Sequence, residues 1–292
     1  MARSIFIIFL LIPFLANAED RGQFRVSSGT GFFVSNMGFI VTNKHVVEGC
    51  KNAVIKGNMP PETVEVVALD PSQDLALLRS SRAPLYAAPL RDNITDLKKE
   101  DAVLVMGYPG NSAMTGQYVL ADAKVLALSG PLGEPDSIQF TDSVQQGNSG
   151  GPLLDTSGNV IGVIVAKSVV WQIDPVTNVK SNEQHSDVAI SLNVLRNFLG
   201  QHGIYARDLI SSLHLTRDRI EDQAKSYIVN VLCSPDDGNR SPVMENRILD
   251  ELKKERFSQL QILPESNVDN PIIQTPPSAN SMVVYDKRQT TR

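Results

Sequence analysis

The chain has 292 residues, of which 20% are charged and 42% hydrophobic, and its formal net charge is −5. This length allows one large domain or two modest ones, and the composition is that of an ordinary globular protein. Because the charge balance is acidic and no long basic run occurs, a nucleic acid is not expected as a partner.

The first eighteen residues have the three-part layout of a secretory signal peptide. Arg3 supplies a positive start, Ile5 to Leu15 form an almost unbroken apolar run, and Ala16-Asn17-Ala18 has the small-x-small form of a cleavage site. An uncleaved membrane anchor is the alternative, but the apolar run is shorter than the roughly 20 residues of a spanning helix. We therefore expect an exported protein, periplasmic or secreted, without a stable membrane span.

From Phe24 to about Ser191 the chain alternates short apolar segments with turns. A hairpin is expected over residues 31–41, and further strands are expected at 54–56, 63–69, 75–78, 103–106, 117–128, 137–140, 153–154 and 160–165. So many strands without helical patterns between them favour an all-β barrel or sandwich. The polar segment Arg91 to Glu100 suggests a crossing between two β halves, and Leu192 to His202 has helical spacing that ends at Gly203.

Beyond Gly203 the pattern changes to a small helix–strand extension over residues 204–233. Residues 234–292 are expected to form a linker, a charged helix over about 244–263 and a disordered tail. Two cysteines, Cys50 and Cys233, remain in a chain bound for an oxidising compartment. They could form one disulfide or remain separate thiols, since sequence does not reveal the distance between them.

The most glycine-rich turn of the chain, Gly147-Asn148-Ser149-Gly150-Gly151-Pro152-Leu153, has a serine at its centre. Glycines allow a sharp turn and close approach of other groups, which leaves the Ser149 hydroxyl accessible. The N–H groups of Gly147 and Ser149 could stabilise a developing oxyanion. We assign Gly147, Asn148 and Ser149 to a candidate oxyanion hole.

A serine hydroxyl needs a base to become a nucleophile. His45 follows an expected strand, and Asp74 begins the apolar run Asp74-Leu75-Ala76-Leu77-Leu78. In this hypothesis His45 takes the proton from Ser149, and Asp74 orients and stabilises the imidazole. Asp70 is the competing acid. His185, His202 and His214 are expected to be surface residues, and Asp142 is expected to order its loop.

These segments resemble the conserved blocks of trypsin-like serine proteases, nearest to the HtrA/Deg branch. The matching segments are Ser28 to Phe32, Thr42 to Val47, Asp74 to Leu77, Gly147 to Leu153 and Asp187 to Ser191. The resemblance implies two six-stranded β-barrels with the catalytic residues between them. It places a protease domain at 19–203, with barrel one at about 24–92, barrel two at about 101–191 and a closing helix at 192–202.

The resemblance also implies protein or peptide substrates, no cofactor and no metal. Ser143 stands where a protease selective for basic residues would carry an acid, so cleavage after Lys or Arg is not expected. A small or medium apolar P1 residue is expected instead, in a pocket formed by Ser143, Val163, Ile164, Val165 and Ala166. Gln146 replaces a proline that is frequent in the family, and no PDZ domain is recognisable after Gly203. The sequence does not predict the oligomeric state.

Two alternatives compete with an active exported endopeptidase. A lapsed protease fold could act only as a binding protein. An α/β-hydrolase esterase also fits Gly147-x-Ser149-x-Gly151, but its histidine would follow the serine, and helices should alternate with its strands.

Overall fold

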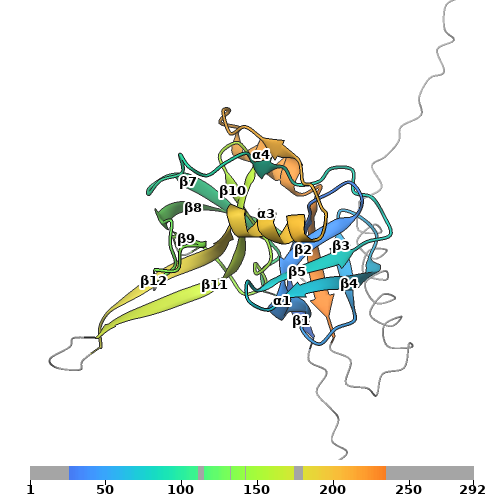
Figure 1. Ribbon diagram of the computed structural model, residues 1–292, viewed down its shortest axis with the longest axis horizontal. Helices are drawn as coiled ribbons and strands as arrows, with labels where there is room; N and C mark the ends of the chain where they lie inside the picture. Colours follow the sequence, from blue (N-terminus) through green and yellow to red (C-terminus); the bar gives the residue numbers. More distant parts are fainter. Residues whose placement is uncertain (1–25, 111–114, 132, 142, 174–179, 235–292) are drawn as a thin grey trace, which may run out of the picture. The chain divides into compact units, whose positions relative to one another are not determined.

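The computed structural model describes residues 26–110, 115–131, 133–141, 143–173 and 180–234, which belong to one compact unit. Two six-stranded antiparallel β-barrels make up most of this part, which confirms the all-β fold class (Figure 1). This architecture contradicts the α/β-hydrolase alternative. The expected signal peptide at 1–18 and charged helix at 244–263 lie outside the described residues.

Barrel one is a closed sheet with the strand order β1-β14-β3-β4-β5-β2. Its strands are β1 (Ser27–Phe33), β2 (Phe39–Asn43), β3 (Asn52–Gly57), β4 (Glu62–Asp70), β5 (Leu75–Arg79) and β14 (Ile228–Cys233). The short helix α1 (Lys44–Val47) follows β2 directly and buries Val46 and Val47. Apolar residues of these strands form the core of barrel one, and β2, β5 and β14 are buried along nearly their whole length.

The sixth strand of barrel one comes from the far end of the domain. β14 pairs antiparallel with β1 from Ser27↔Cys233 to Phe32↔Ile228, and with β3 from Leu232↔Val54 to Val229↔Gly57. All six of its residues are buried, which agrees with its run of β-branched and apolar residues. In Figure 1 this orange strand lies among the blue and cyan strands of barrel one.

This topology differs from the expectation that barrel one is complete within about residues 24–92. The expected extension at 204–233 contains β13 (Asp208–Leu209), helix α4 (Arg217–Ala224) and the barrel strand β14. Meanwhile β6 (Leu90–Arg91) pairs in parallel with β13 and with Val160 in the other sheet. Such long-range pairing leaves no local signal in the sequence.

Barrel two is formed by β7 (Ala102–Gly107), β8 (Val119–Ala127), β9 (Ser137–Phe140), β10 (Pro152–Asp155), β11 (Val160–Ile173) and β12 (Lys180–Ser191). The additional pairing of β10 with β11 closes this sheet. β11 and β12 continue beyond the barrel as a two-stranded ribbon (Figure 1). Helix α3 (Leu192–Gln201) follows β12 and buries one apolar face. No helix in the described part of the chain is long and apolar enough to span a membrane.

A disulfide joins Cys50 to Cys233 across 183 residues. Cys50 follows the turn after α1, and Cys233 is the last residue of β14. The bond therefore ties the closing strand of barrel one to the segment that carries the short helix.

A chain that ends at Gly203 should fail to form barrel one. Ile228, Val229 and Val231 are almost completely buried in β14, and each such side chain contributes about 1.5–3 kcal/mol. Their sum is comparable with the net stability of a domain, about 5–15 kcal/mol. Thermal unfolding followed by circular dichroism should show the full cooperative β fold for a chain that ends at Ser234, and a weaker strand signal without the barrel-one transition for the shorter one. Equal stability of the two chains would contradict the role of β14.

Replacement of both Cys50 and Cys233 by serine should lower the free energy of unfolding by about 2–5 kcal/mol, because the long closed loop is released. Urea unfolding of the oxidised protein and of the double variant measures this difference. Coincident midpoints would show that the disulfide adds nothing to the stability of barrel one.

Candidate active site

His45 and Asp74 meet at the end of barrel one because their elements are neighbours. His45 lies in α1, which follows β2, and Asp74 immediately precedes β5, the strand paired with β2. The Asp74 carboxylate accepts from His45 Nδ1 at 2.7 Å and from the His45 backbone N–H at 3.0 Å. With Nδ1 as the donor, Nε2 is left as the acceptor that a general base needs.

The backbone at Asp74 has a left-handed φ of +52°, which is uncommon for a residue other than glycine. Its carbonyl accepts from the Lys44 N–H at 3.1 Å and from the Asn43 side-chain amide at 3.0 Å. These bonds hold the residue in a conformation that costs energy, as is frequent at functional sites. They also fix the carboxylate beside His45.

Asp70, the competing acid, has a different part in the same turn. Its carboxylate accepts from the Ser72 hydroxyl and from the N–H groups of Ser72 and Gln73. The Ser72 hydroxyl in particular lowers the pKa of Asp70. Asp70 thus orders the turn that leads to Asp74, and the described contacts of His45 go to Asp74.

The Ser149 turn connects β9 to β10 and depends on two glycines. Gly147 has a φ of +100° and Gly150 a φ of +84°, which glycine adopts without steric cost. A Cβ at Gly147 would lie 2.4 Å from the Tyr108 carbonyl oxygen, and one at Gly150 would lie 2.2 Å from the Thr30 carbonyl oxygen. Larger residues at either position would push the turn away from both barrels.

The peptide between Gln146 and Gly147 has its carbonyl fixed. The Gln146 carbonyl accepts from the Gly110 N–H at 2.6 Å. In a trans peptide the carbonyl and the N–H point in opposite directions, so the Gly147 N–H points away from Gly110. Among the described residues this N–H has no acceptor. It is therefore available to a ligand.

The peptide between Asn148 and Ser149 is held in the same manner. The Asn148 carbonyl accepts from the Gly151 N–H at 2.9 Å, and the Ser149 N–H has no acceptor in the described part of the chain. Asn148 was assigned to the same candidate oxyanion hole, but its N–H is not available to a ligand. The Asn148 N–H donates to the Gln145 carbonyl at 3.0 Å and is occupied by the turn itself. The geometry thus offers two N–H groups, those of Gly147 and Ser149.

The Ser149 hydroxyl donates to the Val165 carbonyl at 2.6 Å. The register of β11 against β12 shifts between Ile164 and Ala166, and such a bulge redirects the intervening backbone. In this state the described atoms show no hydrogen bond between Ser149 and His45. The hydroxyl must leave Val165 before the imidazole can take its proton.

The segment before the turn is anchored by a buried carboxylate that the sequence analysis missed. Asp187 in β12 is completely buried, and its Oδ2 accepts from the N–H groups of Ser143 and Val144, both at 2.6 Å. The Ser143 hydroxyl donates to the Asp122 carbonyl at 2.9 Å. The sequence feature that could have indicated this anchor is the acidic residue at the start of the apolar run Asp187-Val188-Ala189-Ile190. That run was interpreted only as a barrel strand.

Two of the residues expected to line a substrate pocket offer no surface in this structure. Val163 and Ile164 are completely buried because successive β11 side chains point into opposite hydrophobic clusters. Val165 is only partly buried, and Ala166 pairs with Val188. Ser143 and Val165 are the expected pocket residues whose described atoms contact the turn or its approach.

Neither His202 nor His214 has a described contact with Asp74. The His202 ring packs edge-on against Phe198, His214 bonds to the Thr156 hydroxyl, and His185 lies in β12. Asp142 is outside the described residues. No group of three acidic, histidine or cysteine side chains suited to a metal occurs in the described ranges.

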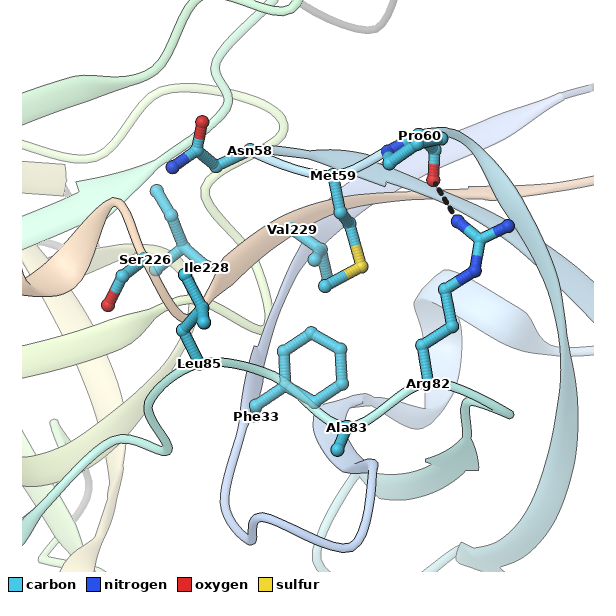
Figure 2. Close-up of a pocket in the computed structure, with 10 residues that line it drawn as sticks. All are labelled: Phe33, Asn58, Met59, Pro60, Arg82, Ala83, Leu85, Ser226, Ile228 and Val229. Atoms are coloured by element: carbon cyan, nitrogen blue, oxygen red, sulfur yellow. Dashed lines mark hydrogen bonds between the residues drawn. The ribbon is translucent and has the colours of Figure 1, made fainter.

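A cavity of about 240 Å³ is lined by residues of barrel one and of the segments 58–60 and 82–85. Figure 2 shows Phe33, Met59 and Val229 facing its interior, and the Arg82 guanidinium bonded to the Pro60 carbonyl. The residues that line it include neither His45 nor any part of the Ser149 turn. This cavity is therefore not part of the candidate active site.

Residues 29–163 match a family model described as a trypsin-like peptidase domain. Protein y4bJ of Sinorhizobium fredii is 35% identical over 221 residues, which are 74% of this chain and 34% of that protein. Serine protease Rv3671c of Mycobacterium tuberculosis is 34% identical over 155 residues, or 50% of this chain and 37% of that protein. Mitochondrial serine protease HTRA2 of Bos taurus is 36% identical over 149 residues, or 49% and 32% of the two chains.

The matched part spans about a third of the length of these relatives. The crystal structure of the Rv3671c protease in its active form superposes with a TM-score of 0.49 and 27% identity, over 63% of this chain and 77% of that chain.

Replacement of Asp74 by asparagine should keep the fold and lower kcat by about 10⁴-fold, because the amide favours the wrong imidazole tautomer. Steady-state hydrolysis of a peptide substrate, with circular dichroism as the folding control, measures this loss. The same replacement at Asp70 is the matched control, since Asp70 has no described contact with His45. A similar loss of kcat for both variants would contradict the assignment of Asp74.

Proposed function

We propose that this chain, a member of the trypsin-like serine protease family, is a serine endopeptidase. In this proposal it acts through His45, Asp74 and Ser149. The observation that carries this proposal is the 2.7 Å hydrogen bond from His45 Nδ1 to the Asp74 carboxylate. It leaves Nε2 as the base for the serine.

In the first half of the proposed reaction, Ser149 Oγ attacks the carbonyl carbon of the peptide bond, and its proton passes to His45 Nε2. The negative charge that forms on the carbonyl oxygen is held by the N–H groups of Gly147 and Ser149; loss of one such donor typically costs about 2.7–4 kcal/mol of barrier. The carbon–nitrogen bond then breaks. His45 gives its proton to the leaving amine, and the acyl group remains on Ser149.

In the second half, water takes the place of the amine. His45 removes a proton from the water as it attacks the acyl carbonyl, and the same two N–H groups hold the second oxyanion. The bond to Ser149 Oγ then breaks, His45 returns the proton to Oγ, and the carboxylic acid product leaves.

We also propose a small or medium apolar residue at P1. Ser143 brings no charge, and the Oδ2 atom of Asp187 is engaged by two backbone N–H groups. Export is supported by the Cys50–Cys233 disulfide, since such bonds persist in oxidising compartments. Relatives such as the DegP-like protein of Bartonella henselae carry names that describe them as probable periplasmic endoproteases.

A fluorophosphonate probe tests the proposed nucleophile. The unaltered protein should become labelled and should digest casein, whereas Ser149→Ala should do neither because the attacking oxygen is missing. His45→Ala should stay folded and lose activity by orders of magnitude, as for other catalytic residues that act as a unit. If the unaltered protein neither reacts with the probe nor digests casein, the proposed function is wrong. Normal digestion by His45→Ala would overturn the assignment of the base.

A further inference from the structure

Thr30 lies in the middle of β1 and is completely buried. It belongs to the segment Ser28-Gly29-Thr30-Gly31-Phe32, for which the proposed reaction has no role. Although β1 belongs to barrel one, the described contacts of Thr30 extend to the Ser149 turn. The residue therefore connects the barrel of His45 to the turn that carries the nucleophile.

The Thr30 hydroxyl is fully used by two backbone groups of the other half of the domain. It donates to the Gly147 carbonyl at 2.7 Å and accepts from the Tyr108 N–H at 2.9 Å. A hydroxyl has one hydrogen to donate and lone pairs to accept, so both contacts form at once. The bond to Gly147 holds the residue that bears one proposed oxyanion N–H.

The backbone of Thr30 holds the other proposed donor residue. Its N–H donates to the Ser149 carbonyl at 2.8 Å, and its own carbonyl accepts from the Thr42 hydroxyl at 2.7 Å. Thr42 is also completely buried and lies in β2, just before α1. A chain of hydrogen bonds thus runs from the strand that leads to His45, through Thr30, to the carbonyls of Gly147 and Ser149.

Glycine at the turn makes such a restraint necessary. Gly147 populates left-handed and right-handed conformations almost equally well, so its φ of +100° is not fixed by its own stereochemistry. Rotation about Gly147 would turn its N–H away from the position described above. The bond from Thr30 to the Gly147 carbonyl opposes this rotation on one side, and the bond from Gly110 to the Gln146 carbonyl opposes it on the other.

We propose that Thr30 is a positioning residue whose hydroxyl holds the Gly147 peptide in the orientation that stabilises the oxyanion. Thr30 does not touch the reacting atoms. It acts through Gly147, so its effect should fall on the transition state more than on substrate binding. This inference rests on the proposed serine endopeptidase activity, but the order of the turn can be measured without any activity.

The test compares Thr30→Val with Thr30→Ser. Valine has nearly the same shape but neither donates to Gly147 nor accepts from Tyr108, whereas serine keeps the hydroxyl. Ser80→Ala is the matched control because Ser80 is also buried, and its hydroxyl donates to Glu62 at 2.9 Å and accepts from the Arg82 N–H at 3.0 Å. Ser80 has no described contact with the Ser149 turn.

Two measurements are made on each full-length variant. Hydrogen–deuterium exchange of peptides covering residues 143–151 and of the Tyr108 amide reports the order of the turn. Steady-state kinetics on a peptide substrate reports kcat and KM separately. Thr30→Val should raise exchange in both regions and lower kcat by at least 10-fold, towards the 10²–10³-fold loss seen when an oxyanion donor is removed, with KM changed less than threefold. Thr30→Ser should keep most of the kcat and most of the exchange protection of the unaltered protein.

The proposal is overturned if exchange in residues 143–151 is the same in Thr30→Val as in Ser80→Ala, or if kcat falls equally in those two variants. An unaltered protein without activity would defeat the proposed protease function instead. In that case the exchange measurement alone still decides whether Thr30 holds the turn.

Discussion

Closure of barrel one by β14 is the constraint on which the rest of the domain depends. A barrel with five strands would leave the N–H and carbonyl groups of β1 and β3 unpaired at two open edges, which is costly for buried backbone. β14 satisfies both edges and buries all six of its residues. Because α1 packs against β14 and the disulfide joins Cys50 to Cys233, the same strand also supports the helix that carries His45.

The closing strand β14 and the Ser149 turn share one neighbour, β1. Asn230 of β14 is the register partner of Thr30, and Thr30 bonds to the carbonyls of Gly147 and Ser149. β1 therefore links β14, at the end of the domain, to the Ser149 turn. The geometry of the candidate active site combines backbone hydrogen bonds with a few buried side chains, among them Thr30, Thr42 and Asp187. This explains why glycines and a buried threonine surround the serine, since larger or purely apolar residues would break that network.

Local patterns in the sequence predicted local features well. The spacing of apolar residues predicted α3, the expected helix–strand extension at 204–233 contains α4 and β14, and the resemblance of five segments to trypsin-like proteases implied the two barrels. The partners of β14 could not be predicted, because strand pairing over some 200 residues depends on the whole barrel. The anchoring role of Asp187 was hidden for a similar reason, since its bonds to Ser143 and Val144 join segments that are remote in sequence.

The position of β14 at the end of the domain has a consequence for synthesis. A chain emerging from the ribosome presents β1 to β5 first, and all strands of barrel two follow before residue 228 appears. Barrel one therefore stays open while its first five strands and all of barrel two are translated. Since this long-range pairing is also slow to form, the segment with His45 and Asp74 matures last, although it is made first. The order of strands thus separates synthesis of the segment with His45 and Asp74 from closure of the barrel that holds it.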